Sequence, residues 1–212
     1  MITTDEQAWE TCSLKDKWVF NKLEVAMRTG LKCGLREIPV FMKGQYIIRP
    51  VYNLNGLSRG TKDRYLTPKT TEFNVPLGHF WSEKLQGEHL SVDYVFGTPV
   101  LTVVGKKFKN SLSLFDSWTK ISSEKAPQLP DFLYDLTTRH SVINVEFINN
   151  IPIEVHLRPN PDFTNHNYNK LITVFSPLEA DLSNPDFIED KATVHGQDGQ
   201  KFTRYGFIGS DE

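Results

Sequence analysis

With 212 residues, 39% of them hydrophobic and 24% charged, the chain has the size and composition of one globular domain of two lobes or of two small subdomains. The formal net charge of −2 at pH 7 lacks the basic excess typical of proteins that bind nucleic acid or membrane surfaces. Two cysteines without zinc-site spacing, a polar start and the lack of an apolar run of about 18 residues predict a cytoplasmic protein with reduced thiols.

The first part of the chain is predicted to be helical and then to change to short strands. Apolar residues recur near helical spacing over 4–34. Residues 39–42 and 46–48 are predicted to form a hairpin or two short strands. The glycines, small polar residues and bases of 53–62 predict a flexible loop.

The rest of the chain is predicted to contain antiparallel pairs and one clear helix. Strands are predicted over 90–96, 99–105, 142–148, 151–157 and 203–208. The helix begins at Pro130-Asp131 and runs to about His140, whereas 111–130 is predicted to be mostly irregular. Helices and hairpins in this order predict an α+β fold.

The predicted hairpin of 142–157 carries the strongest chemical signal. Asn149-Asn150 is expected to be its turn, because Asn tolerates positive φ. A tight turn sets Glu146 near Ile153 or its neighbours, so Glu146 and Glu154 can be close. Close carboxylates are tolerated when one is protonated or when a hard cation such as Mg²⁺ lies between them. The alternative is an exposed hairpin with polar outer residues.

Residues with a spacing of two extend this signal along the second strand. Glu154, His156 and Arg158 share one face of it, and Arg158 can hold an anionic substrate or a developing negative charge. Two weaker signals precede the hairpin. The glycine loop after Arg49 can cover phosphates, although it is neither a Walker A nor a Rossmann loop, and 81–89 can supply adenine and ribose contacts. Ordinary surface connections are the alternative for both.

In order and spacing, these segments resemble the ATP-grasp superfamily from about Asp16 to Pro159. Asp16-Lys17 resembles the family's helix-opening segment, with Lys22 as the alternative lysine. Arg49 stands at the family's phosphate-binding lysine, and His156 stands where the family has Asn. The resemblance implies nucleotide contacts at Lys17, Arg49, Gly56, Ser58, Gly60, Glu83, Lys84, Leu85, Glu88 and His89. It implies metal ligands at Glu146, Glu154 and His156, and catalytic roles for Arg158 and Arg49.

The resemblance also implies a fold and an activity. The expected fold is α+β, with an N-terminal lobe over 1–82, a C-terminal lobe over 83–212, and antiparallel sheets enclosing a nucleotide cleft. The expected activity is an ATP-dependent ligase of carboxylate–amine or carboxylate–thiol type, with ATP and Mg²⁺ (or Mn²⁺), acting through an acylphosphate on an unidentified carboxylate substrate. The alternatives are a non-catalytic ATP-binding or adaptor protein, a kinase on the same fold, and a structural or interaction protein.

Family ligases usually carry a further domain before this region, which helps to build the acceptor site. The chain is therefore expected to be a reduced form, in which a homodimer or a partner protein completes that site. No nucleic acid and no membrane is expected among its partners.

Overall fold

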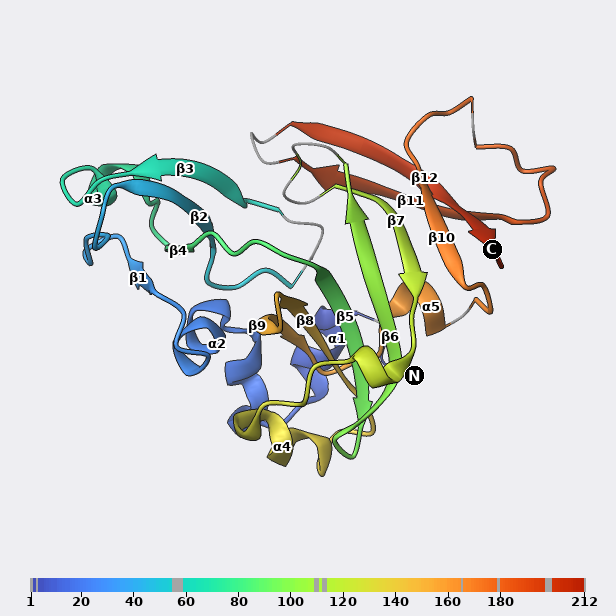
Figure 1. The fold of residues 1–212 in the computed structure, drawn as a ribbon, viewed down its shortest axis with the longest axis horizontal. Coiled ribbons are helices and arrows are strands. Elements are labelled where there is room, and N and C mark those ends of the chain that lie inside the picture. Colours follow the sequence, from blue (N-terminus) through green and yellow to red (C-terminus); the bar gives the residue numbers. More distant parts are fainter. Residues whose placement is uncertain are drawn as a thin grey trace.

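The computed structural model describes residues 2, 4–54, 59–108, 111, 114–164, 166–178, 180–196 and 200–211. It is an α+β structure with two sheets, in which every strand pairing is antiparallel. The fold class predicted from the sequence is therefore confirmed. In Figure 1 the small sheet lies at the left, the C-terminal strands lie at the upper right, and the longer helices lie below.

The small sheet has four strands in the order β1-β4-β2-β3. Its strands are β1 (Cys33–Leu35), β2 (Gly44–Pro50), β3 (Lys62–Leu66) and β4 (His79–Glu83), with the short helix α3 (Thr71–Asn74) between β3 and β4. The strand predicted over 39–42 is wrong, since these residues form a loop. Val40 in that loop is instead buried in a small core with Ile48 and Trp81.

The large sheet has eight strands in the order β11-β12-β10-β7-β6-β5-β8-β9. Its strands are β5 (His89–Val95), β6 (Thr98–Lys107), β7 (Phe115–Lys120), β8 (Ile143–Ile148), β9 (Ile151–His156), β10 (Lys170–Val174), β11 (Phe187–His195) and β12 (Lys201–Ser210). The hairpins predicted at 90–105 and 142–157 are confirmed. The prediction that 111–130 is irregular is wrong at β7, which pairs with both β6 and β10.

The helices cover one face of the large sheet. They are α1 (Asp5–Thr11), the 3-10 helix η1 (Leu14–Phe20), α2 (Lys22–Arg28), η2 (Ser123–Lys125) and α4 (Asp131–Thr137). The short helix α5 (Pro161–Thr164) lies on the other face, where Phe163 packs with Val103 and Phe207. Side chains of α1, η1, α2 and α4 share the main core with the apolar residues of β5, β8 and β9. The chain before β1 therefore packs with the large sheet. None of the described helices combines the length and apolar character that a membrane-spanning helix needs.

Strand alternation leaves a polar face on the other side of the same strands. In β5, Leu90 and Val92 enter the core, whereas His89 and Ser91 face away from it. The same period places Glu146 of β8 on the polar face, opposite the core residue Val145. The sequence pattern of three neighbouring strands thus separates a helix-covered core from a face that is available for chemistry.

Candidate functional site

A cavity of about 560 Å³ lies between the two sheets, over the polar face of the large one. Its lining combines residues of α1 and α2, of β2 and β4 in the small sheet, and of β5 to β12 in the large sheet. This volume is within the range of small-molecule sites, roughly 300–1,000 Å³. The cavity is therefore large enough for a nucleotide-sized ligand.

The hairpin of β8 and β9 brings two acids together in this cavity. Its turn residues Asn149 and Asn150 have φ of 51° and 62°, the left-handed values that a two-residue hairpin turn needs. Phe147 pairs with Pro152, but Glu146 pairs with Glu154, so Ile153 is an extra residue in a β-bulge. The bulge places Glu146 and Glu154 directly opposite each other, and both line the cavity.

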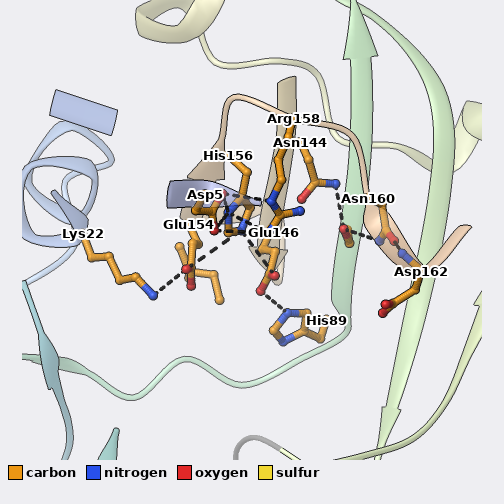
Figure 2. A network of polar contacts seen from close by, with 12 residues as sticks. Asp5, Lys22, His89, Asn144, Glu146, Glu154, His156, Arg158, Asn160 and Asp162 are labelled. Carbon is orange, nitrogen blue, oxygen red and sulfur yellow. Dashed lines mark hydrogen bonds and ion pairs between the residues drawn. The ribbon is translucent and has the colours of Figure 1, made fainter. Parts of the chain in front are cut away.

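Three basic side chains surround the two carboxylates (Figure 2). The ammonium of Lys22 on α2 forms an ion pair with Glu154. His89 Nε2 lies 3.0 Å from Glu146 Oε2, and His156 Nε2 lies 3.6 Å from Glu146 Oε1 and 3.9 Å from Glu154 Oε1. Burial alone would raise the pKa of Glu146, but hydrogen bonds from His156 and His89 hold it well below its usual value. Glu146 is therefore ionised at neutral pH.

Asp5, at the start of α1, anchors the other side of His156. Its oxygens lie 2.9 and 3.0 Å from His156 Nδ1, and Arg158 Nε lies 3.0 Å from Asp5 Oδ1. Burial raises the pKa of Asp5, yet His156 and Arg158 outweigh it and lower the pKa to about 2. Asp5 could not be predicted as a site residue from the sequence, because an acid in the first turn of a helix is ordinary and no local pattern connects it to β9.

His156, predicted from the sequence as a metal ligand, is held in place by this anchoring. Burial lowers the pKa of His156, but Asp5 and the Glu146 hydrogen bond raise it to about 9. With that pKa the imidazole carries its proton at neutral pH in the ligand-free protein. In the described part of the chain, no three His, Cys, Asp or Glu side chains are grouped to hold a metal ion. In the ligand-free protein, the protonated His156 is a counter-ion to both acids.

Arg49 of β2 connects the small sheet to the bulge. Its Nη1 donates a hydrogen bond of 3.1 Å to the Ile153 carbonyl, which belongs to the extra residue of the bulge. The guanidinium lies over the Phe80 ring, 5.1 Å from its centroid. Arg49 Nε is buried and finds no hydrogen-bond acceptor among the described residues. Arg49 thus brings a fixed positive charge and an unused donor to the cavity, as expected of a phosphate-binding residue.

The expected hinge residues Glu83, Lys84 and Leu85 all line the cavity. The Glu83 N–H donates to the Lys32 carbonyl at 2.9 Å, and Lys84 Nζ lies 2.6 Å from Asp63 Oδ2. His89 and Arg158 also line the cavity. These sequence-predicted residues therefore meet around one space, although they come from both sheets.

Other predicted residues lie elsewhere. Lys17 does not line the cavity, because its ammonium packs over the Trp9 ring at 4.4 Å, and Lys22 takes its place. Glu88 is exposed and contributes its carbonyl to the Asn149 N–H, which leaves His89 as the cavity residue of that pair. Gly60 lies beside the cavity residue Thr61 but is not itself in the lining. Gly56 and Ser58 fall outside the described residues.

A second polar network fixes the chain that follows β9. Asn144 Nδ2 donates to Ser91 Oγ and to Asp93 Oδ1, both at 2.8 Å. The backbone N–H of Asn160 donates to Asp93 Oδ1 at 3.0 Å, and its side chain donates to Ser91. Burial raises the pKa of Asp93 to about 6 in spite of these bonds. The network ties the segment that begins α5 to the floor of the cavity (Figure 2).

Searches of family models and of curated proteins give no match to this chain. Its structure matches solved ATP-grasp proteins at low sequence identity. A protein assigned to the ATP-grasp superfamily from Archaeoglobus fulgidus has a TM-score of 0.49 and 13% identity, over 91% of this chain and 64% of that one. An L-amino acid ligase from Bacillus licheniformis has a TM-score of 0.41 and 14% identity, over 72% of this chain and 44% of that one.

A D-alanine–D-alanine ligase from Bacillus anthracis has a TM-score of 0.39 and 14% identity, over 70% of this chain and 60% of that one. This chain thus spans less than two thirds of the length of each of these proteins. Similarity at this level is confined to the general arrangement of the fold. The chemistry of this chain rests on its own side chains.

Proposed function

We propose that this chain binds ATP in the cavity and uses it to activate a carboxylate substrate as an acylphosphate, as an ATP-grasp-type ligase does. The observation that carries the proposal is the pair of opposed carboxylates, Glu146 and Glu154, with Lys22, Arg49 and Arg158 lining the same cavity. Two hard anionic ligands beside several cations suit a metal-bound polyphosphate better than they suit an apolar ligand.

Each part of ATP has residues that suit it. Backbone groups of 83–85 and the apolar side chain of Leu85 suit the base, and His89 suits the ribose. Arg49 and Lys22 suit the phosphates, because both bring positive charge to the acid pair. Glu146 and Glu154 would hold Mg²⁺, or Mn²⁺ in its place. When bound, such an ion neutralises charge on the transferring phosphoryl group.

The first chemical step is the transfer of the γ-phosphoryl group to the substrate. A carboxylate oxygen attacks the γ-phosphorus, the bond from that phosphorus to the β,γ-bridging oxygen breaks, and ADP leaves. A nucleophile then attacks the acyl carbon, and phosphate leaves with the electron pair of the broken C–O bond. Arg158, held by Asp5, neutralises the carboxylate charge, and the protein mainly positions the reactants.

A second candidate is an ATP-binding protein without catalysis. The close contacts of Lys22, His89 and His156 favour it, because three basic side chains already neutralise the acids. Both candidates require ATP in the same cavity. They differ in whether a carboxylate substrate is consumed.

Trapping with hydroxylamine tests the ligase proposal. The purified chain is incubated with ATP, Mg²⁺, hydroxylamine and a set of carboxylic and amino acids, and hydroxamate and phosphate are measured. The proposal predicts hydroxamate with at least one acid, and a loss of about a hundredfold in Glu154→Gln. Glu88→Gln, which changes an exposed acid outside the cavity, should retain the full rate. ATP binding without hydroxamate from any acid would contradict the ligase and favour the second candidate.

A further inference from the structure

The cavity continues past the acid pair to the far strands of the large sheet. This distal end is lined by Asp162, Thr173, Phe175, Asp190, Arg204 and Phe207, which come from α5, β10, β11 and β12 and from the residue after β10. None of them belongs to the segments that suit ATP. The distal end is therefore available for a second reactant.

Arg204 is already committed to protein partners. Its guanidinium forms an ion pair with Asp190, and its Nε donates to the Asp190 carbonyl at 3.3 Å. It also lies over the Phe207 ring, 4.6 Å from the centroid. The charges of Arg204 and Asp190 therefore neutralise each other, so neither side chain is available to bind a charged ligand.

Asp162 differs from Asp190 in this respect. Its backbone N–H donates a hydrogen bond to Asn160 Oδ1 at 3.0 Å, at the start of α5. No hydrogen bond or ion pair reaches its carboxylate from any residue that the structure describes. Figure 2 shows this carboxylate turned away from Asn160, without a dashed contact. Burial raises its pKa, and Arg204, Asp190, Arg158 and Glu146 are the charges that act on it. Asp162 is thus an acid of the distal end whose carboxylate has no hydrogen-bond or ion-pair partner among the described residues.

The distal end also presents two aromatic side chains, Phe175 and Phe207. Phe207 is buried, and the ring of Phe175 is held by edge contacts to Phe108 and Phe202 at centroid distances of 5.6 and 6.4 Å. A carboxylate without a hydrogen-bond partner, in a distal end that also presents aromatic side chains, favours a cation with an organic group, and it repels a carboxylate or phosphate. A thiol or an alcohol would leave the Asp162 charge uncompensated.

We propose that the distal end binds a primary amine that carries an apolar or aromatic group, with the Asp162 carboxylate contacting its ammonium. This inference rests on the proposed function, because the bound amine is the nucleophile that attacks the acylphosphate. In that reaction the amine first loses a proton to solvent and its lone pair attacks the acylphosphate carbon. The C–N bond forms, the C–O bond to phosphorus breaks, and the second nitrogen proton leaves with the phosphate as HPO₄²⁻. Arg158 and Asp162 line the same cavity as the acid pair, so the carboxylate, the phosphate and the amine would share one space.

Amine binding can be measured without the natural substrates. Isothermal titration of the full chain with 2-phenylethylamine is compared with 2-phenylethanol, which has the same shape without the charge. We expect the amine to bind the native chain and the alcohol to bind at least tenfold more weakly. Asp162→Asn should weaken the amine tenfold or more, Asp162→Glu should retain most of the affinity, and Asp131→Asn, an exposed acid of α4 outside the cavity, should change nothing.

The inference is overturned if the native chain does not bind the amine, if the alcohol binds equally well, or if Asp162→Asn binds the amine as the native chain does. Titration of ATP in the same samples separates this failure from that of the proposed function. Asp162→Asn should bind ATP within twofold of the native chain. If the native chain does not bind ATP, the proposed function is contradicted. If it binds ATP but its amine affinity is the same with and without the Asp162 carboxylate, only this inference is contradicted.

Discussion

Asp5 is the residue on which the arrangement of the site's cations depends most. Its carboxylate is almost fully buried and contacts both His156 and Arg158, which point toward the acid pair and toward the substrate region. A buried carboxylate with two cationic partners is stabilising only as a complete set, because removing one member leaves an unpaired charge. Asp5 is therefore a positioning residue for the proposed chemistry.

We predict that Asp5→Asn lowers the free energy of unfolding by about 3 kcal/mol at pH 7, since His156 and Arg158 lose their buried counter-charge. Urea denaturation measures this, with Glu10→Gln, an exposed acid of the same helix, as the matched control. The pH dependence of the free energy of unfolding in acid gives a second measurement. The Asp5 pKa of about 2 is below its unfolded value of 3.8, so its contribution is complete above pH 3.8 and is lost as the pH falls toward 2. An Asp5→Asn variant with unchanged stability would contradict the assigned role.

His156 predicts the opposite pH dependence. Its folded pKa of about 9 is above its ordinary value of 6.5, so the stabilisation is complete below pH 6.5 and is lost as the pH rises through about 9. Melting temperatures of the native chain and of His156→Gln, measured from pH 6 to 10, should converge as the pH rises. A constant difference across that range would show that His156 is not held as a cation.

The residues of the site were predictable from the sequence only where their position depends on residues nearby in the chain. Glu146, Glu154 and Arg158 follow from strand period and a short turn, which are local properties. Asp5 contacts His156 across 151 residues, and Arg49 contacts Ile153 across 104. Such pairs depend on how α1 and β2 pack against the large sheet, which no spacing rule encodes. Lys17 was preferred to Lys22 for the same reason, since the side chain that faces β9 is set by helix packing.

At the level of elements, the β8–β9 hairpin sets the geometry of the acids. Its turn was predicted from Asn149-Asn150, but its bulge was not, because a bulge depends on partners outside the strand. Here the Ile153 carbonyl of the bulge is taken by Arg49 of the small sheet. The bulge thus places the two acids opposite each other, and its carbonyl connects the two sheets.

Replacing the turn residue tests the role of the hairpin. Asn150→Val should lower the free energy of unfolding by about 1–3 kcal/mol, because a β-branched residue is strained at φ of 62°. Asn150→Gly is the matched control and should retain native stability, since glycine adopts this conformation freely. Thermal denaturation measures both. Equal losses in the two variants would show that the side chain of Asn150, and not its backbone angle, is what matters.

Replacing Arg49 tests the connection between the sheets. Arg49→Ala should weaken ATP binding at least tenfold, since both the charge and the bond to Ile153 are lost. Arg49→Lys should recover part of the affinity, because the charge remains while the fork of donors does not. Calorimetric titration with ATP measures both variants. Arg49→Ala with native ATP affinity would remove Arg49 from the proposed phosphate site.

At the scale of the whole molecule, the helices give the large sheet its core and thereby leave the opposite face for the cavity. The sequence predicted the α+β class and the antiparallel hairpins, because these follow from local patterns. The placement of the first helices was not predictable, since their apolar faces would pack equally well against either sheet. Their docking against β5, β8 and β9 is what brings Asp5 and Lys22 to the acids.

Calorimetric titration with ATP tests the proposed metal-assisted nucleotide site between the sheets most directly. Titrations with and without Mg²⁺ are carried out on the native chain, Glu154→Gln and the exposed control Glu88→Gln. We predict micromolar to millimolar binding by the native chain and Glu88→Gln, strengthened by Mg²⁺, and a loss of the Mg²⁺ effect in Glu154→Gln. No ATP binding by the native chain, or an Mg²⁺ effect that survives in Glu154→Gln, would contradict it.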